Sequence, residues 1–182
     1  MSKALFLDRD GIINVDHGYV HKIEDFEFVD GIFELCQSAI AKGYEIFVIT
    51  NQAGIARGFY DITMFEKLTQ WMVAAFAGHG VAIAKVYYCP HHPSKGVNEF
   101  VTSCQCRKPA PGMIMQAQQE FTIDIKESIF IGDKISDMQA ASNAGVGCKI
   151  LLDSRYTNEQ PAVQLVGVNR VNELTQANAF IK

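Results

Sequence analysis

Two carboxylates stand near the start of the chain, where a run of apolar residues gives way to a turn. Asp8 and Asp10 lie in the segment ALFLDRDGIINVD, residues 4–16. Side chains at this spacing can share a divalent cation such as Mg²⁺, which prefers oxygen ligands and relieves the repulsion between the two carboxylates. One carboxylate can then act as a nucleophile while the other transfers protons. The alternative is an ordinary loop, because Asp and Gly are frequent in turns.

Three later segments supply the other groups that phosphoryl transfer needs. In FIGDKISD, Asp133 would add a third acidic ligand, and Asp137, one helical turn on, could orient a metal-bound water or a neighbouring lysine. VITNQAGIARG offers the Thr50 hydroxyl and a turn whose N–H groups can bind an anion. CRKPAPG offers Arg107 and Lys108, a bidentate fork and a point charge for phosphate oxygens. Each group alone is weak, but together they predict a phosphoryl-transfer site.

The apolar pattern of the chain predicts the elements that would bring these segments together. Short, mostly continuous apolar runs are typical of buried parallel strands, and they occur at Ala4–Leu7, Tyr44–Ile49, Ala84–Tyr88, Ser128–Ile131 and Cys148–Leu152, with a weaker run near Gln164–Val168. Helical spacing predicts helices over Gly31–Lys42 and Thr63–Phe76, with starts at Asp61 or Thr63 and stops at Gly43 and Gly145. We interpret Arg155–Gln164 as a connecting loop before the last strand.

Alternating strands and helices predict an α/β domain with a mainly parallel sheet. Ligands bind at the carboxyl ends of the strands in such sheets. Asp8, Thr50 and Asp133 each fall at the carboxyl end of a predicted strand, so we expect them to meet at one edge.

Composition and charge narrow the class of protein. A length of 182 residues predicts one core, and we expect a single domain over residues 1–182. A net charge of −4 argues against nucleic-acid binding, which relies on Lys and Arg. The sequence shows no signal peptide and no apolar run that could span a membrane, and an odd count of five cysteines does not suit a secreted disulfide framework. We therefore expect a cytoplasmic protein and, without an extended apolar stripe, a monomer.

Most of the cysteines gather in the least regular region, His91–Pro111 and the residues before it. Cys89-x-His91 and Cys104-x-Cys106 match the Cys₃His ligand set of a structural zinc site, although the one-residue spacing within each pair is tighter than usual. His92 is a competing ligand, and a set of free cysteines in a loop is the alternative.

A closed four-ligand site leaves no open position for a reaction, so zinc here would be structural. Because Cys106 directly precedes Arg107 and Lys108, the metal would anchor the loop that directs both cations. The remaining cysteines, Cys36 and Cys148, lie on apolar stretches and are interpreted as small core residues.

The motifs FLDRDG, VITN, the lysine of CRKP and IGDKISD resemble, in this order, the four motifs of the haloacid dehalogenase superfamily of phosphatases. The resemblance implies a Rossmann-like three-layer sandwich without a cap domain. It makes Asp8 the nucleophile and Asp10 the acid and base, while Thr50 and Lys108 stabilise the transferring phosphoryl group. Asp8, the main-chain carbonyl of Asp10, and Asp133 would hold Mg²⁺. The chain departs from many members at Ile12, where they carry Thr.

Within the superfamily, the zinc loop resembles that of the heptose 1,7-bisphosphate 7-phosphatases and of the histidinol-phosphate phosphatases. Segments such as DRDGIINVDHGYVH and TNQAGIARG resemble the first family more closely, and the family pattern favours His91 over His92 as zinc ligand. That likeness implies a sugar-phosphate substrate and a role in making the activated heptose of bacterial lipopolysaccharide. The implied substrate contacts are Asp16, His17, Gly18, Tyr19, Thr50, Asn51, Gln52, Ala53, Arg107, Lys108 and Lys134.

Two alternatives remain open at this point. The chain could be a histidinol-phosphate phosphatase, or a zinc-stabilised binding module without catalysis, although the acidic charge and the full motif set oppose the second. Arg107, Lys108, Lys134 and Arg57 offer more cations than one phosphate needs, which favours a doubly phosphorylated sugar. Arg57 and Lys134 could instead be solvated, or bridge to Asp137.

Overall fold

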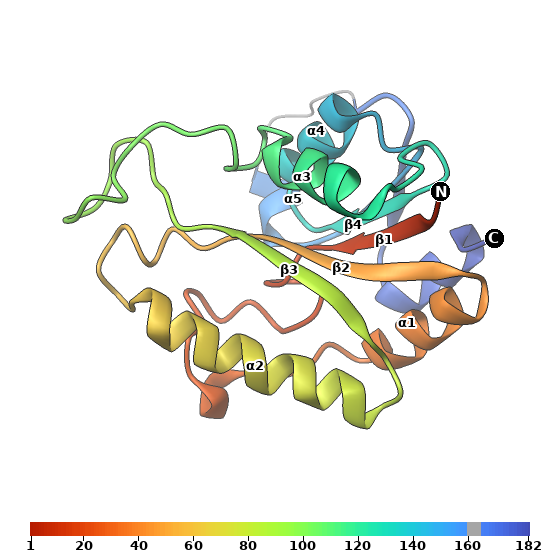
Figure 1. Ribbon diagram of the computed structural model, residues 1–182, viewed down its shortest axis with the longest axis horizontal. Helices are drawn as coiled ribbons and strands as arrows, with labels where there is room; N and C mark the ends of the chain where they lie inside the picture. Colours follow the sequence, from red (N-terminus) through yellow and green to blue (C-terminus); the bar gives the residue numbers. More distant parts are fainter. Residues whose placement is uncertain (160–164) are drawn as a thin grey trace.

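Six parallel strands form one sheet at the centre of the computed structural model, which describes residues 1–159 and 165–182 (Figure 1). The strands are β1 (Lys3–Leu7), β2 (Tyr44–Asn51), β3 (Ile83–Cys89), β4 (Ile129–Gly132), β5 (Cys148–Leu152) and β6 (Val168–Val171). Their order is β3-β2-β1-β4-β5-β6, and all five neighbouring pairs are parallel. The order reverses between β1 and β4, which is where a Rossmann-like sheet opens a crevice at its carboxyl edge.

Helices cover both faces of the sheet, so the molecule has three layers (Figure 1). On one face lie α1 (Ile32–Ala41), α2 (Ile62–Gly78) and the 3-10 helix η2 (Leu174–Phe180), and on the other lie α3 (Gly112–Phe121) and α4 (Ile135–Ala144). The 3-10 helix η1 (Ile23–Asp25) and the short α5 (Arg155–Glu159) complete the set within the described residues. The predicted α/β class and its mainly parallel sheet are confirmed, and the described residues contain no separate cap domain.

The side chains of each central strand alternate between the two layers. In β1, Leu5 and Leu7 pack in the core shared with α1 and α2, while Ala4 and Phe6 pack in the core shared with α3 and α4. Because both faces are buried, the strand reads as a continuous apolar run in the sequence.

Residue types at the helix ends account for where the predicted helices start and stop. Asp61 is the N-cap of α2, since its carboxylate accepts a hydrogen bond of 2.8 Å from the Met64 N–H, so the start lies there rather than at Thr63. Gly43 follows α1 and Gly145 ends α4, with φ values of 82° and 81° that favour glycine.

The C-terminal part differs most from the sequence-based expectation. The last strand is Val168–Val171 rather than Gln164–Val168, and Gln164 lies outside the described residues. The predicted loop Arg155–Gln164 begins instead with the helix Arg155–Glu159, and its remainder, residues 160–164, also lies outside them. The run QLVGV is apolar but contains Gly167, which adopts a φ of 71° and delays the strand to the residues after it.

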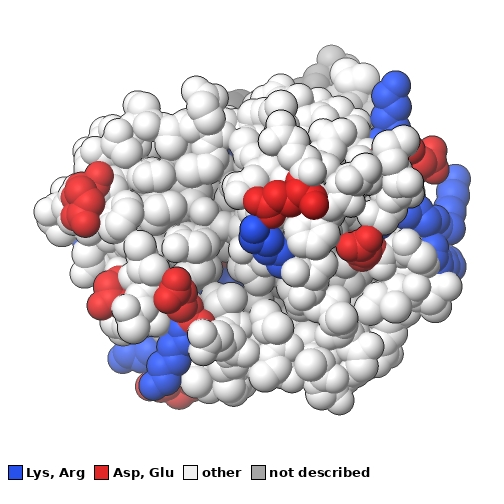
Figure 2. All heavy atoms as spheres, viewed as in Figure 1, with Lys and Arg blue, Asp and Glu red and all other residues white. Residues whose placement is uncertain are grey.

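The surface carries charge of both signs. On the face seen in Figure 2, acidic and basic side chains occur in small groups and leave most of the area uncharged. In the part of the chain that the structure describes, no helix has the length and apolar character needed to cross a membrane.

Candidate active site

A cavity of about 470 Å³ opens at the carboxyl edge of the sheet. The ends of β1, β2 and β4 lead into it, together with the loops at residues 16–19, 52–61 and 90–111, of which the last two extend to the left in Figure 1. The predicted site residues that line it are Asp8, Asp10, Asp16, Gly18, Tyr19, Asn51, Gln52, Ala53, Arg107, Lys108 and Lys134. Segments far apart in the sequence are thus brought to one place.

A cluster of buried ionisable groups forms the floor of this cavity, and we call it the acid centre: Asp8, Asp133, Asp137 and Lys108. One carboxylate oxygen from each of the three acids lies within 4.8 Å of the others. All four residues are at most 4% exposed. Asp8 and Asp133 follow β1 and β4 directly, and Asp137 lies in the first turn of α4, so regular elements position all three acids.

Lys108 links two of these acids. Its Nζ lies 2.9 Å from Asp8 Oδ1 and 2.7 Å from Asp137 Oδ1, and it donates a hydrogen bond of 2.9 Å to the Ile49 carbonyl. Burial alone would lower the pKa of the Lys108 amine, but the charges of Asp137 and Asp8 outweigh burial and raise it. The amine is therefore a fixed cation beneath the cavity, available to oppose the charge of a phosphoryl group.

Asp137 also caps the N-terminus of α4. Its Oδ2 accepts hydrogen bonds from the Asp133 N–H at 3.2 Å and the Lys134 N–H at 3.0 Å. The same side chain therefore fixes the Asp133 backbone with one oxygen and Lys108 with the other. Of the two roles predicted for Asp137, the orientation of a lysine is the one that the geometry shows.

The carboxylates of the acid centre carry more negative charge than one lysine offsets. Burial raises the pKa of Asp8 to about 6, and the negative charge of Asp137 adds to the effect while Lys108 and Lys134 oppose it. Burial, with the charge of Asp8, raises the pKa of Asp133 to about 8. Such shifts mean that the ionised groups lack a compensating cation.

The donor set at this position fits a hard divalent cation. The buried Asp133 Oδ1 accepts no hydrogen bond from any described residue. The backbone of Gly11 approaches the same carboxylate so closely that an added Cβ would lie 2.3 Å from Asp133 Oδ2, and its φ of +93° also favours glycine. Carboxylate oxygens from two strand ends, next to close-packed backbone, are the ligands that Mg²⁺ takes in proteins.

The Asp10 carboxylate lines the cavity and is held by three donors. Its Oδ1 accepts hydrogen bonds from Arg9 Nη2 at 2.8 Å and Asn14 Nδ2 at 3.1 Å, and its Oδ2 accepts one from Gln52 Nε2 at 3.1 Å. Arg9 is only 1% exposed and also donates to the Val20 carbonyl. Sequence reasoning missed Arg9 and Asn14, because an arginine between two aspartates gives no sign that it is buried.

Gln52 is itself fixed by a buried tyrosine. Tyr60 donates from its hydroxyl to Gln52 Oε1 at 2.5 Å, which turns the Nε2 group toward Asp10 and toward Thr50 Oγ1 at 2.8 Å. Thr50 is completely buried and does not itself line the cavity, and the predicted ligand Asp133 also lies beneath it. Tyr60, Ser136, Pro109 and Tyr156 line the cavity but were not predicted as site residues.

Asn51, at the end of β2, forms two hydrogen bonds with the loop that contains Lys108. Its Oδ1 accepts from the Lys108 N–H at 3.0 Å, and its Nδ2 donates to the Lys108 carbonyl at 3.1 Å. Arg107 donates from Nη1 to the His91 carbonyl at 3.2 Å, and its N–H lies 3.4 Å from Cys104 Sγ. The cation pair is thus connected to the sheet on one side and to the cysteines on the other.

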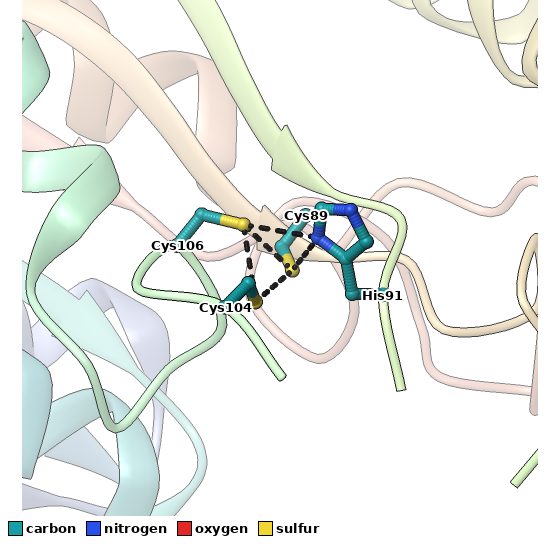
Figure 3. Close-up of side chains that lie close together, drawn as sticks. All are labelled: Cys89, His91, Cys104 and Cys106. Carbon is teal, nitrogen blue, oxygen red and sulfur yellow. Dashed lines mark hydrogen bonds between the residues drawn. The ribbon is translucent and has the colours of Figure 1, made fainter. Parts of the chain in front are cut away.

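Four side chains, Cys89, His91, Cys104 and Cys106, point toward one another and form what we call the Cys/His cluster (Figure 3). The three sulfur–sulfur distances are 3.0, 3.3 and 3.5 Å, and His91 Nδ1 lies 3.3 Å from Cys106 Sγ. A tetrahedral zinc ion would hold sulfurs roughly 3.8 Å apart, so a small outward shift would accommodate it. Burial opposes ionisation of the Cys104 thiol, but the Arg107 N–H and the neighbouring thiols outweigh burial and lower its pKa.

His92, the competing ligand, has a different role in this arrangement. Its Nδ1 accepts hydrogen bonds from the N–H groups of Ser94 at 3.2 Å and Lys95 at 2.9 Å, so it stabilises a turn. The geometry therefore favours His91 as the fourth ligand.

Of the three remaining candidates, His17 and Arg57 do not line the cavity and Lys134 does. His17 turns away from the cavity and pairs with Glu27 at 3.0 Å in a neighbouring groove. Arg57 contacts Tyr19 instead of lining the cavity. Lys134 faces Asp16 at 3.6 Å rather than bridging to Asp137; burial would lower the pKa of its amine, but Asp8 and the other acids raise it.

Comparison with known proteins gives concordant matches. A family model described as "HAD-hyrolase-like" matches residues 105–170. The chain is 46% identical, over 98% of its length and 96% of the relative's, to the D-glycero-beta-D-manno-heptose-1,7-bisphosphate 7-phosphatase of Photorhabdus laumondii. It is 53% identical to the D-glycero-alpha-D-manno-heptose-1,7-bisphosphate 7-phosphatase of Campylobacter jejuni, over 84% of this chain and 83% of that one.

A solved structure shows the same fold. The D,D-heptose 1,7-bisphosphate phosphatase from B. bronchiseptica, complexed with magnesium and phosphate, superposes with a TM-score of 0.84 at 27% identity, covering 98% of this chain and 97% of that one.

Proposed function

Because the chain belongs to the haloacid dehalogenase superfamily and, within it, to the heptose 1,7-bisphosphate 7-phosphatase family, we propose that it removes the 7-phosphate of D-glycero-D-manno-heptose 1,7-bisphosphate. As a member of this family it is a phosphoric monoester hydrolase. The observation that carries the proposal is the pairing of Asp8 with Lys108 on the cavity floor, beside an Asp10 carboxylate that faces the cavity. Relatives named for the beta and for the alpha anomer both match the chain.

The geometry supports a nucleophilic role for Asp8. Its Oδ1 is engaged by Lys108 Nζ and by the Arg9 N–H at 2.8 Å, which leaves Oδ2 to attack the phosphorus atom. As the new bond forms, the phosphorus–oxygen bond to the sugar breaks, and Asp10 donates its proton to the leaving oxygen. Asp10 then removes a proton from a water whose oxygen bonds to phosphorus as the bond from phosphorus to Asp8 breaks, which releases inorganic phosphate and restores the Asp8 carboxylate.

The other residues of the acid centre stabilise this chemistry. Lys108 opposes the charge on the transferring phosphoryl group, and Thr50, held by Gln52, lies beneath the same position. Asp8, the Asp10 carbonyl and Asp133 would hold Mg²⁺. When bound, the ion supplies positive charge to the acids and to the phosphate oxygens. The orphaned Asp133 oxygen and the magnesium in the B. bronchiseptica phosphatase support this choice of metal.

We assign a structural Zn²⁺ to Cys89, His91, Cys104 and Cys106. The cluster supplies four ligands, which fills a tetrahedral shell and leaves no position for substrate. Its connection to Arg107 supports a role in ordering the loop that presents Arg107 and Lys108.

Substrate contacts would come from the residues that line the cavity. We propose this role for Asp16, Gly18, Tyr19, Asn51, Gln52, Ala53, Arg107 and Lys134, with His17 outside the set because it turns toward Glu27. The names of the relatives support a small-molecule sugar-phosphate substrate. We further propose a single phosphatase domain over residues 1–182 that acts in the cytoplasm as a monomer, without nucleic acid or membrane, and contributes to lipopolysaccharide biosynthesis.

Phosphate release with Mg²⁺ from a small panel tests the proposal. The panel contains both anomers of heptose 1,7-bisphosphate, histidinol phosphate, fructose 1,6-bisphosphate and p-nitrophenyl phosphate, with the Asp8→Asn variant as control. We expect a clear preference for one heptose anomer, with the 1-phosphate retained. A preference for histidinol phosphate would reject the substrate, and ligand binding without phosphate release from any ester would reject the enzyme.

A further inference from the structure

The loop at residues 16–19 forms one wall of the cavity in a conformation that needs outside support. Asp16, Gly18 and Tyr19 line the cavity, and the Gly18 N–H donates to Asp16 Oδ1 at 2.9 Å. Gly18 and Tyr19 have φ values of 84° and 50°, both in the left-handed region. Glycine adopts this region readily, but an aromatic residue such as Tyr19 does so only at a cost in free energy. Contacts from elsewhere must therefore stabilise the loop.

Tyr156 holds the first end of this loop. Its hydroxyl donates to Asp16 Oδ2 at 2.8 Å, from a position 140 residues later in the chain. Arg155 Nη2 donates to the Tyr156 hydroxyl at 2.8 Å and approaches the Asp16 carbonyl at 3.4 Å. On the cavity side, Lys134 Nζ lies 4.5 Å from the centre of the Tyr156 ring and 3.6 Å from Asp16 Oδ2. Tyr156 thus joins the loop to a cation of the cavity wall.

Arg57 holds the other end. Its Nη1 donates to the Tyr19 hydroxyl at 2.8 Å, and its guanidinium carbon lies 5.5 Å from the centre of the Tyr19 ring and 5.1 Å from that of Phe59. The two aromatic rings meet edge to face, with centres 4.7 Å apart. Phe59 is 48% exposed and Tyr19 44%, so these rings contribute little to the core. Tyr19 lines the cavity, so its contacts with Arg57 and Phe59 hold a residue of the cavity wall.

The acid centre does not depend on these contacts. Asp8, Lys108 and Asp137 are held by one another and by the ends of β1, β2 and α4. Loss of the support at residues 16–19 would therefore leave the phosphate-binding floor intact. It would disorder the part of the wall that lies beyond the phosphate, where the polyhydroxylated body of a substrate must be bound.

We propose that Arg57 and Tyr156 are positioning residues that determine specificity for a sugar phosphate, because they hold the loop at residues 16–19 against the cavity before substrate binds. This inference rests on the proposed phosphatase activity. A wall formed in advance loses less conformational freedom on binding, so its contribution is expected in substrate affinity rather than in the chemical step.

The test compares two esters in four variants. Arg57→Gln and Tyr156→Phe each remove one contact and keep most of the side chain. Arg170→Gln and Tyr87→Phe are matched controls, because Arg170 pairs with Asp153 at 2.6 Å and the Tyr87 hydroxyl donates to Glu120 at 2.7 Å, both away from the cavity. The esters are the sugar phosphate that the wild-type chain prefers and p-nitrophenyl phosphate, which has no sugar.

For Arg57→Gln and Tyr156→Phe we expect KM for the sugar phosphate to rise about five- to tenfold, with kcat changed less than twofold. We expect kcat/KM for p-nitrophenyl phosphate to stay at the wild-type value, as both constants should in the two controls. An unchanged KM, or an equal loss on both esters, would overturn the inference while leaving the phosphatase intact. A wild-type chain that releases phosphate from no ester would overturn the proposed function and this inference with it.

Discussion

The acid centre and the Cys/His cluster are adjacent in the chain, since Lys108 follows Cys106 by two residues, but they are built in opposite ways. The three acids of the acid centre stand at the ends of β1, β4 and the start of α4, and they are buried although three like charges repel one another. The Cys/His cluster joins the last residue of β3 to an irregular loop and has partly exposed members.

The two sites therefore differ in what fixes the positions of their side chains. The sheet positions the acid centre, and the acid centre costs the fold stability in return. The loop around the Cys/His cluster lies outside helices and strands, so a metal bound there would add to the few contacts, such as those of Asn51 with Lys108, that hold this loop. Substitutions in the two regions should therefore separate activity from stability.

Asp8→Asn is expected to separate activity from stability most clearly. The amide cannot attack phosphorus, so we expect phosphate release to fall by about a thousandfold or more. Because burial disfavours the Asp8 carboxylate, a neutral side chain of the same shape should leave the melting temperature in magnesium-free buffer at pH 8 equal or higher. Activity assays and thermal melting check the two parts. A variant that unfolds at lower temperature would show that Asp8 supports the fold after all.

Cys106→Ser is expected to give the opposite pattern. We expect loss of one proposed ligand to release the zinc proposed for this cluster and to lower the melting temperature by about 10 °C, which corresponds to a few kcal/mol for a chain of this size. Activity should fall as well, but less than in Asp8→Asn, because Arg107 and Lys108 lose order while the acids remain. Metal analysis and thermal melting measure the effect.

Cys148→Ser is the matched control for Cys106→Ser, because Cys148 is a partly buried cysteine on β5, outside the cluster. We expect it to keep both zinc and melting temperature. If Cys106→Ser lost zinc and turnover while melting at the wild-type temperature, a purely structural role for the metal would be rejected.

The pH dependence of stability tests whether the buried carboxylates of the acid centre destabilise the fold. The pKa values of Asp8 and Asp133, about 6 and about 8 in the folded chain, both lie above the ordinary value of 3.8. Between the ordinary pKa of 3.8 and these raised pKa values, the folded state binds more protons than the unfolded state. The stabilisation from protonation is complete below about pH 4 and is lost as the pH rises through 6 and 8.

We therefore expect the zinc-loaded, magnesium-free chain to melt about 5 °C lower at pH 8 than at pH 5, and Mg²⁺ to restore the difference at pH 8. Thermal melting with and without millimolar Mg²⁺ measures this. Asp133→Asn should reduce both the pH dependence and the effect of Mg²⁺. A melting temperature that rises from pH 5 to pH 8 without Mg²⁺ would contradict the burial of uncompensated acids.

The same contrast accounts for what the sequence could and could not predict. The position of Asp8 and Asp133 follows from local signals, an apolar run and the turn after it, and the α/β class follows from the same runs. Helix α3 was not predicted: the expected irregular region ended at Pro111 and no element was assigned to the residues after it, although Met113, Ile114 and Ala117 have helical spacing.

Contacts between distant segments left no local signal at all. The hydrogen bond from Tyr156 to Asp16 joins residues 140 positions apart, and the buried Arg9 donates hydrogen bonds to the Val20 carbonyl and to Asp10. Neither residue type is unusual for its segment. Such partners are decided by how the loops pack over the sheet edge, which no periodicity records.

The smallest effect on activity is expected at Tyr60, which positions Asp10 through Gln52. Tyr60→Phe would leave the buried Gln52 Oε1 without its donor, at a cost of about 1 kcal/mol, and would free the amide to turn its Nε2 away from Asp10 and Thr50. Because the contacts of Arg57 and Tyr156 with the loop at residues 16–19 are unchanged, we expect kcat to fall about three- to tenfold on every ester, with a smaller change in KM. Steady-state kinetics on the sugar phosphate and on p-nitrophenyl phosphate distinguish this from the KM effect of Tyr156→Phe. If Tyr60→Phe altered KM for the sugar phosphate alone, Tyr60 would act through the cavity surface that it lines and not through the support of Asp10.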